Sequence, residues 1–218
     1  MEAPKVLDLW KQRLGVVPDS VFQDTSLETL ILADNDLESI PESIKNLKHL
    51  RTLDLGHNHL VAVPESLGDL VRLDRFLYLH DNRLTALPGS LAQLTFLRYL
   101  NVSENAFAEW PEAVTDMAAL RELRFTDNPL REVPASVSCL TGLRELHLRN
   151  NRLTSLPQSV GDLADLRQLD LRGNPLLALP ESISHLPKLE KLDLRWTQTL
   201  PHLPWLADLE ARGCLVYR

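Results

Sequence analysis

The stretch that decides the fold is Leu50–Arg72, with the sequence LRTLDLGHNHLVAVPESLGDLVR. Its pattern, LxxLxLxxNxLxxLPxxLxxLxx, recurs along nearly the whole chain. One proline and one asparagine mark the period independently, at steps of 23 residues with a single step of 24. The prolines are Pro18, Pro41, Pro64, Pro88, Pro111, Pro134, Pro157 and Pro180, and the asparagines are Asn35, Asn58, Asn82, Asn105, Asn128, Asn151 and Asn174. A fixed period of this length indicates a solenoid of stacked repeats.

Each repeat contains the alternation of a short strand, because Leu53 and Leu55 flank the polar Asp54. The amide of Asn58 follows this strand and offers donors and an acceptor to backbone groups that would otherwise be unpaired. Pro64 then suits the first position of a short helical or 3₁₀ segment. A single repeat cannot bury its leucines alone, so each repeat is stabilised by stacking on its neighbours.

This pattern resembles the leucine-rich repeat (LRR) family, and the resemblance covers nearly the whole chain. The form with 23 residues and a Leu-Pro step is most similar to Ras-suppressor-type repeats and to many bacterial intracellular repeat proteins. The resemblance implies a curved, right-handed α/β repeat solenoid with a parallel concave β-sheet and short helical, 3₁₀ or extended convex segments. It also implies protein recognition, because similar repeats form the targeting half of bacterial effector ubiquitin ligases and scaffolds in GTPase and kinase signalling.

The repeats leave no separate block, so we expect residues 1–218 to form a single LRR domain. We assign residues 4–26 to a degenerate first repeat and residues 27–188 to seven full repeats. Residues 189–218 are interpreted as a partial repeat and a C-terminal cap.

One repeat contains an extra residue between Leu73 and Asn82. This residue must lie in Asp74-Arg75-Phe76, just before the next strand leucine. One interpretation is a β-bulge in the strand, a feature often found near functional sites. The alternative is a neutral insertion that a loop absorbs.

The composition limits the classes of partner. The chain has 218 residues, is 44% hydrophobic and carries a formal charge of −7. This acidity argues against a nucleic-acid partner, because nucleic-acid binding needs a clustered basic face. Neither a signal peptide nor an apolar run of membrane-spanning length is visible, so no membrane partner is expected. Cys139 and Cys214 lie several repeats apart, which suits a reducing compartment. We therefore expect a cytoplasmic protein, in the host cytoplasm if it is a secreted bacterial effector.

In LRR proteins the non-leucine strand positions face outward on the concave surface, so equivalent positions form columns. These columns bring aromatic residues together on two adjacent strands, with one asparagine beside them. Interface anchors are enriched in aromatic residues, so this group is the first candidate binding site. The alternative is cross-strand packing that only stabilises the sheet. The residues are Phe76, Tyr78, His80, Tyr99 and Asn101.

The second candidate site is cationic and lies further along the same columns. Three of its four arginines stack on consecutive turns, about 5 Å apart. Guanidinium groups bind carboxylate or phosphate bidentately, so such a ladder suits an acidic or phosphorylated segment. Carboxylates are interleaved with it, at Glu122, Glu145, Asp170 and Asp193, so internal neutralisation is the favoured interpretation. The candidate residues are Arg124, His147, Arg149, Arg172, Arg195 and Trp196.

The sequence gives no indication of catalysis, a cofactor or a metal site. His57, His59, His80 and Asp81 are predicted to approach one another, but a zinc site needs three or four ligands in fixed geometry. Surface imidazoles are the favoured interpretation. No nucleophile has a recognisable base partner, and the glycines form no phosphate-binding loop.

We therefore expect a non-enzymatic module that binds a protein or peptide partner on its concave face. One alternative is the substrate-recognition domain of a larger multidomain protein, such as a bacterial effector ubiquitin ligase or a signalling kinase. A second alternative is a self-associating structural module. We expect a monomer, with a dimer formed through an exposed strand edge as the other possibility.

Overall fold

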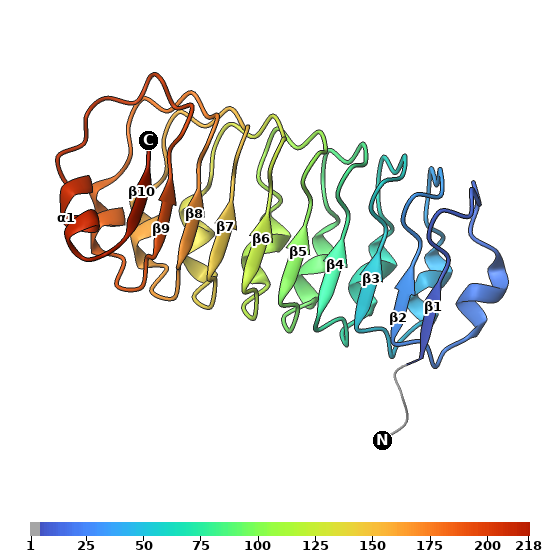
Figure 1. Ribbon diagram of the computed structural model, residues 1–218. Coiled ribbons are helices and arrows are strands. Elements are labelled where there is room, and N and C mark those ends of the chain that lie inside the picture. Colours follow the sequence, from blue (N-terminus) through green and yellow to red (C-terminus); the bar gives the residue numbers. More distant parts are fainter. Residues whose placement is uncertain (1–4) are drawn as a thin grey trace.

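The computed structural model describes residues 5–218, which form one ten-stranded parallel sheet (Figure 1). Strand order follows chain order throughout, so each strand pairs only with the preceding and following strands. The first residue of the predicted repeat 4–26 lies outside the described residues. The strands are β1 Val6–Asp8, β2 Thr29–Ile31, β3 Thr52–Asp54, β4 Phe76–Tyr78, β5 Tyr99–Asn101, β6 Glu122–Arg124, β7 Glu145–His147, β8 Gln168–Asp170, β9 Lys191–Asp193 and β10 Leu215–Tyr217.

The chain returns between strands through short helical segments on the other side of the repeat from the sheet (Figure 1). In each 3₁₀ helix the repeat proline occupies the position before the first helical residue, with extended backbone angles. The predicted LRR solenoid is confirmed. The helices are η1 Asp19–Gln23, η2 Glu42–Asn46, η3 Glu65–Asp69, η4 Gly89–Gln93, η5 Glu112–Asp116, η6 Ala135–Cys139, η7 Gln158–Asp162, η8 Glu181–His185 and α1 Leu206–Ala211.

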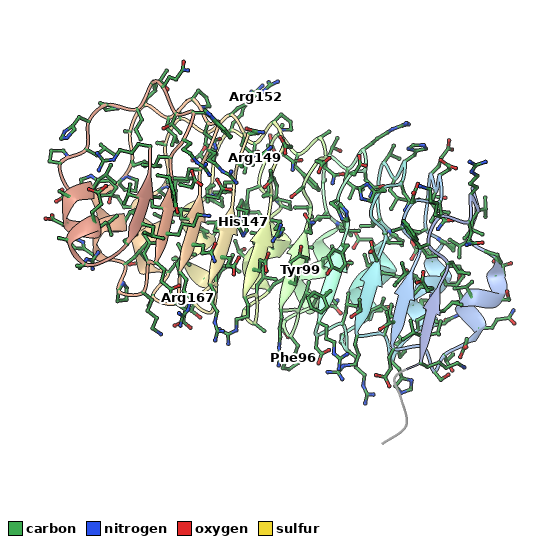
Figure 2. The ribbon with its side chains drawn as sticks, viewed as in Figure 1. Phe96, Tyr99, His147, Arg149, Arg152 and Arg167 are labelled. Carbon is green, nitrogen blue, oxygen red and sulfur yellow. The ribbon has the colours of Figure 1, made fainter. Side chains whose placement is uncertain are left out.

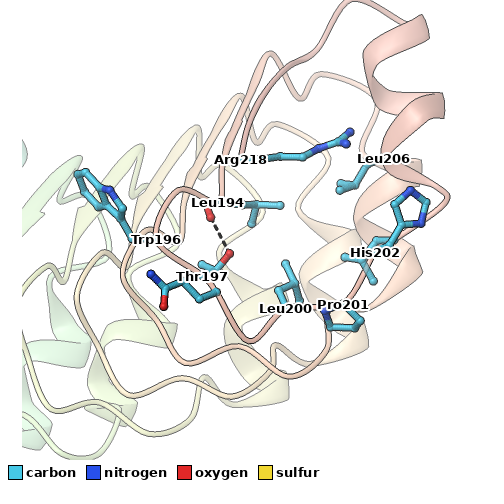
Figure 3. A pocket seen from close by; sticks show the side chains of 10 residues that line it. Leu194, Trp196, Thr197, Leu200, Pro201, His202, Leu206 and Arg218 are labelled. Atoms are coloured by element: carbon cyan, nitrogen blue, oxygen red, sulfur yellow. Dashed lines mark hydrogen bonds between the residues drawn. The ribbon is translucent and has the colours of Figure 1, made fainter.

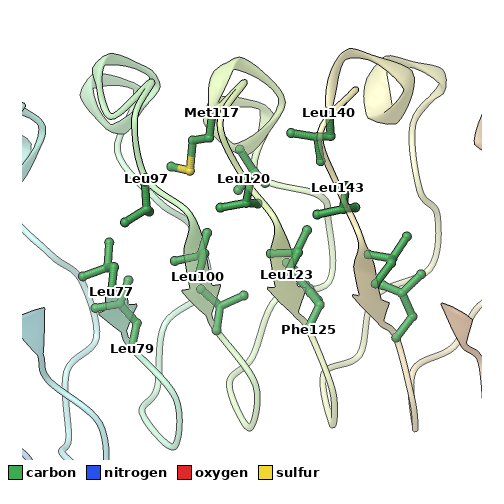
Figure 4. Packing of buried hydrophobic residues seen from close by; sticks show 14 of the residues in the cluster. Leu77, Leu79, Leu97, Leu100, Met117, Leu120, Leu123, Phe125, Leu140 and Leu143 are labelled. Atoms are coloured by element: carbon green, nitrogen blue, oxygen red, sulfur yellow. The ribbon is translucent and has the colours of Figure 1, made fainter. Parts of the chain in front are cut away.

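The repeated leucines form one continuous core between the sheet and the helices (Figure 4). Leu77, Leu100 and Leu123 occupy the same strand position in successive repeats and are fully buried. Phe125 takes a leucine position and packs against Trp110, with ring centroids 5.6 Å apart. Because each leucine contacts the repeats on both sides, the core extends along the whole stack.

The asparagines that mark the period form a ladder along the stack, and we call them the ladder asparagines. Each of them joins its own repeat to the one before it. Asn58 Oδ1 accepts hydrogen bonds from the backbone N–H groups of Asn35 and Leu37, both at 3.0 Å. Its Nδ2 group donates to the carbonyl oxygen of Leu32 in the preceding repeat and to two carbonyls of its own turn. These buried amides satisfy backbone groups at the points where the strands end. Equivalent bonds between repeats occur at Asn82, Asn105, Asn128, Asn151 and Asn174.

The residue immediately before each ladder position adopts a positive φ. Gly173 is relaxed in this conformation, whereas each other side chain there costs roughly 1–2 kcal/mol. The ladder hydrogen bonds that follow hold the turn in place. The eight other residues are Lys11, Asp34, His57, Asp81, Glu104, Asp127, Asn150 and Trp196, with φ between 51° and 62°; Lys11 and Trp196 precede Gln12 and Thr197, which replace the asparagine.

The extra residue of the fourth repeat lies in the connection before β4. Phe76 pairs with Thr52 on β3 and with Tyr99 on β5 in unbroken register. The carboxylate of Asp74 accepts two hydrogen bonds from Arg51, at 2.9 Å and 2.6 Å. Of the two interpretations of the extra residue, the β-bulge in the strand is therefore wrong. The loop alternative is correct, because the extra residue lies before the strand begins. Its position is stabilised by the ion pair between Asp74 and Arg51.

The two ends of the sheet differ. β10 pairs in parallel with β9, and α1 contacts η8 with Leu206 and Leu209 buried. At the other end β1 forms an edge strand, and Val6 and Trp10 near this edge are 53% and 57% exposed.

Asn151→Ala is expected to reduce the free energy of unfolding by about 3 kcal/mol. The change removes the acceptor of the Leu130 N–H group and leaves the carbonyl oxygens of Phe125 and Leu148 without this donor. Urea denaturation followed by circular dichroism measures the effect. The matched control is Asn46→Ala in η2, which is exposed and should change stability by less than about 0.5 kcal/mol. Equal losses in the two variants would contradict the proposed role of the ladder.

Candidate functional site

The aromatic cluster, defined as Phe76, Tyr78, His80 and Tyr99, lies on β4, β5 and the turn after β4. Phe76 and Tyr78 are two residues apart and share one face of the strand, and Tyr99 lies opposite Phe76. The ring centroids are 5.0 Å apart for Tyr78 and Tyr99, 5.5 Å for Phe76 and Tyr99, and 5.9 Å for Phe76 and Tyr78. The structure thus brings the predicted aromatic residues together at distances typical of favourable ring pairs. Asn101 lies beside them, opposite Tyr78.

The cluster is partly open to solvent. Phe76 is 41% exposed, while Tyr78 and Tyr99 are intermediate in burial. Burial raises the pKa of Tyr78 and raises that of Tyr99 to about 12, so both phenols remain neutral donors near pH 7. The Arg124 guanidinium lies 6.0 Å from the centre of the Tyr99 ring, at the outer limit of a cation–π contact.

His80 extends the cluster toward a histidine in the previous repeat. Its Nε2 atom is 3.2 Å from Nε2 of His57, whose Nδ1 atom is 2.6 Å from Asp81 Oδ2. A Cβ atom at Gly56 would lie 2.3 Å from the His80 ring, so the glycine permits this close approach. Burial lowers the pKa of His80, and the neighbouring His57 acts in the same direction. Of the four residues that were predicted to approach one another, His57, His80 and Asp81 do so. The remaining one, His59, faces Asp36 instead.

Two arginines of the cationic candidate are neutralised in the same way. Asp170 accepts hydrogen bonds from Nε and Nη2 of Arg172 at 2.8 Å and 2.6 Å. Asp193 accepts the equivalent bonds from Arg195 at 2.9 Å and 2.7 Å. Each carboxylate lies two residues before its arginine, on the same face of the strand. The predicted internal neutralisation is confirmed for these two arginines.

Trp196 lies beside these two pairs and is 63% exposed. The guanidinium carbons of Arg172 and Arg195 lie 5.9 Å and 5.7 Å from the ring centroid. Arg195 also lies 5.3 Å from the ring of Tyr217 on β10. Sequence columns could not identify Tyr217 as a neighbour, because the closing strand falls outside the period of the repeats.

Arg149 differs from the other arginines of the candidate site. His147 occupies the position two residues before it, where the next two repeats have aspartate. The Arg149 Nε atom is buried and has no hydrogen-bond partner within residues 5–218. Figure 2 shows His147 and Arg149 near one another along β7 and the turn that follows. The surrounding hollow has a volume of about 290 Å³ and is lined by Asn101, Ser103, Glu104, Arg124, Thr126, Asp127, His147, Arg149, Asp170 and Arg172.

Within the described part of the chain, one group of three side chains has the spacing for a metal ion. Oxygen atoms of Glu122 and Glu145 and a nitrogen of His147 lie within 4.8 Å of one another. His147 Nε2 is 3.1 Å from Glu145, and Arg124 Nε donates to Glu122 at 2.6 Å. Because Arg124 already binds a carboxylate of this group, the three side chains form part of a charge network with the arginine.

Other hollows lie outside the sheet columns. One of them, which we call the edge groove, has a volume of about 700 Å³ and lies just before the strands begin. It is lined by Val71, Phe96 and the Arg51–Asp74 pair, among others, and Figure 2 shows Phe96. The repeat pattern alone does not reveal this groove. The available signal was Phe96, a large aromatic residue at a position where the neighbouring repeats have Arg72 and Ala119. Another cavity, of about 290 Å³, lies between the turn after β9 and the start of α1, where Thr197 donates a hydrogen bond to the Leu194 carbonyl (Figure 3).

The chain belongs to the leucine-rich repeat family. A family profile described as a leucine-rich repeat region matches residues 5–126, and a second, described as leucine rich repeat, matches residues 141–198. No curated protein sequence matches the chain significantly. LRR domains are in general protein-binding modules without catalytic activity.

Solved structures of similar proteins support the same assignment. The LRR domain of the type III effector XopL is 28% identical, with a TM-score of 0.82, over 97% of this chain and 75% of that one. An LRR protein of Leptospira interrogans is 26% identical, with a TM-score of 0.75, over 94% of this chain and 64% of that one.

A third similar structure is the ectodomain of the plant membrane receptor kinase GASSHO1/SCHENGEN3 from Arabidopsis thaliana. It is 29% identical, with a TM-score of 0.82, over 98% of this chain and 26% of that one. That ectodomain was solved in complex with CASPARIAN STRIP INTEGRITY FACTOR 2. The chain therefore spans about a quarter of this ectodomain and 64% of the Leptospira protein. Within residues 5–218, the helices are all too short or too polar to cross a membrane.

The Asp193–Arg195 pair predicts a pH dependence of stability. Burial acts to raise the pKa of Asp193, but hydrogen bonds from the side chain and backbone of Arg195 outweigh it and lower the pKa overall. A lowered pKa gives stability that is present above the unfolded value of about 4 and is lost as the pH falls through the folded value.

We expect Asp193→Asn to reduce the free energy of unfolding at pH 7 by roughly 2 kcal/mol, because two arginines lose a buried partner. The variant should also lose less stability than the wild type between pH 5 and acid pH, as urea titrations at each pH will measure. Asp208→Asn, at an exposed position of α1, is the control. An unchanged acid limb in the Asp193 variant would contradict this account.

Proposed function

We propose that the chain is a non-catalytic recognition module that binds a protein or peptide partner on the concave face of its sheet. The observation that carries this proposal is the aromatic cluster on that face. Its rings support one another within the sheet, yet Phe76 remains 41% exposed. Large aromatic side chains held in place before binding lose little conformational entropy when a partner covers them. The cluster therefore has the properties of a binding anchor.

Polar groups around the rings fit the same function. Tyr78 and Tyr99 present neutral phenols, and the imidazole of His80 and the amide of Asn101 lie next to them. An apolar anchor with polar neighbours is the arrangement found in specific protein interfaces. The GASSHO1/SCHENGEN3 complex supports a protein or peptide as the class of ligand. We propose a location in the cytoplasm, or in the host cytoplasm for a secreted effector, because the two cysteines are free thiols.

A second candidate function is the substrate-recognition domain of a larger protein, such as a bacterial effector ubiquitin ligase or a signalling kinase. Its support is the likeness to the LRR domain of XopL, which is a domain of a type III effector. A third candidate is self-association through β1, supported by the exposure of Val6 and Trp10 near that edge. Light scattering over a range of protein concentrations separates this candidate from the others. A constant monomer mass excludes it.

Replacing Tyr78 and Tyr99 together by alanine is expected to weaken partner binding by at least about tenfold. Both side chains lie outside the leucine core, so the free energy of unfolding should fall by less than about 2 kcal/mol. The measurement is quantitative affinity purification from the native cell and from candidate host cells, followed by titration of the recovered partner.

The matched control is Phe96→Ala, which removes an exposed aromatic side chain from the edge groove instead of the sheet face. The control should bind the partner as the wild type does. Large unfolding of the double tyrosine variant without loss of binding per folded molecule would overturn the proposal. Loss of binding only in the Phe96 variant would move the site to the edge groove.

A further inference from the structure

We infer that Arg149 is the centre of a binding site for one anionic group, a carboxylate or a phosphate, carried by the partner on the concave face. That the anion arrives on a protein partner rests on the proposed function. The chemistry of the site rests on Arg149 and its surroundings alone.

The three arginines of this column differ in one respect. Arg172 and Arg195 each donate two hydrogen bonds to the aspartate two residues earlier. Arg149 has His147 at that position, and the histidine is directed to Glu145 at 3.1 Å. Within residues 5–218, Arg149 has neither a carboxylate at ion-pair distance nor a partner for its buried Nε atom.

An unpaired guanidinium with a buried N–H group is unfavourable, because the lost hydrogen bonds to water are not replaced. Arginine offers a planar set of donors that matches the two oxygens of a carboxylate or phosphate. An anionic group would therefore supply to Arg149 what Asp170 and Asp193 supply to the next two arginines. Of the three repeats with an arginine at this position, one lacks the paired aspartate. Its sequence at residues 147–149 is His-Leu-Arg, whereas the next two repeats have Asp-Leu-Arg.

The hollow around Arg149 has room for such a group, with a volume of about 290 Å³ and a lining that is largely polar. Thr126 occupies the position equivalent to Arg149 one repeat earlier, and its hydroxyl is an additional donor on that side. On the other side Arg172 adds positive charge, although Asp170 neutralises most of it.

Two carboxylates of the same hollow limit what it can accept. Asp127 accepts a hydrogen bond from the side chain of Asn150 at 2.7 Å, and Glu104 lies one repeat earlier. Both occupy the positive-φ turn position of their own repeats, one residue after the position that is equivalent to Arg149. A single anionic group placed against Arg149 and Thr126 fits this distribution of charge, whereas a densely acidic segment would be repelled.

The test uses the free protein and simple anions as probes, so its result does not depend on finding the partner. Arginine side-chain Nε–Hε signals of the ¹⁵N-labelled chain are recorded while sodium acetate, or separately inorganic phosphate, replaces chloride at constant ionic strength. We expect a saturable shift of the Arg149 signal and no saturable shift at Arg195. Saturation with acetate only indicates a carboxylate ligand, and saturation with phosphate only indicates a phosphorylated one.

Variants separate the site from general charge effects. Arg149→Gln should weaken the anion-dependent rise in thermal midpoint by at least about tenfold in anion concentration. Arg152→Gln is the matched control, because Arg152 is exposed and lies outside the hollow (Figure 2), and it should behave as the wild type.

His147→Asp tests the comparison between repeats directly. The introduced carboxylate should pair with Arg149 as Asp170 pairs with Arg172, and so compete with the added anion. The inference is overturned if neither anion gives a saturable shift at Arg149, or if His147→Asp and Arg149→Gln respond to the anions as the wild type does. Absence of a saturable anion response in the wild type, together with loss of partner binding in the double tyrosine variant, would leave the proposed function standing and remove only this site.

Discussion

The hydrogen bonds of the ladder asparagines are the interaction on which the rest of the structure depends. The strands have only three residues each, so the hydrogen bonds between strands cannot hold the chain once it turns away from the sheet. The amide of Asn58 bonds to backbone groups of its own turn and of the preceding one. Because the same bonds recur in each repeat, they set a constant turn and a constant register.

This constant register arranges the side chains of the sheet face in columns. Every residue next to a strand leucine lies beside its equivalent in the adjacent repeat, so one residue type at one position becomes a neighbour of the next. The aromatic cluster arises in this way from β4 and β5. The same rule places Arg149 next to Arg172 and makes the change from aspartate to His147 visible as an unpaired guanidinium. Local sequence differences therefore change the surface without changing the fold.

Much of this arrangement could be predicted from the sequence. The period and the buried leucines follow from spacing, and the neighbours within the aromatic cluster follow from the in-register stacking that the resemblance to LRR proteins implies. The position of the extra residue did not follow, since spacing cannot separate a strand insertion from one absorbed before the strand by the Arg51–Asp74 pair.

Other features depended on side-chain conformation. The columns of equivalent positions bring arginines and carboxylates together but do not show which of them pair. Asp170 and Asp193 reach the arginine of their own strand, and Arg149 has no equivalent. The contact between His57 and His80 likewise requires the close approach at Gly56, which no column of residues reveals. The columns do not reveal the edge groove, because its lining residues lie before the strands begin, outside the columns of the sheet face.

The central claim is that the partner binds the concave face. A photo-crosslinking phenylalanine analogue, incorporated in place of Tyr99 or, in a separate protein, in place of the exposed Gln93 in η4, tests it most directly. The products are identified by mass spectrometry after irradiation in cells. The account predicts a covalent adduct with one protein from position 99 and none from position 93. An adduct formed only from position 93 would place the partner on the convex side and contradict it.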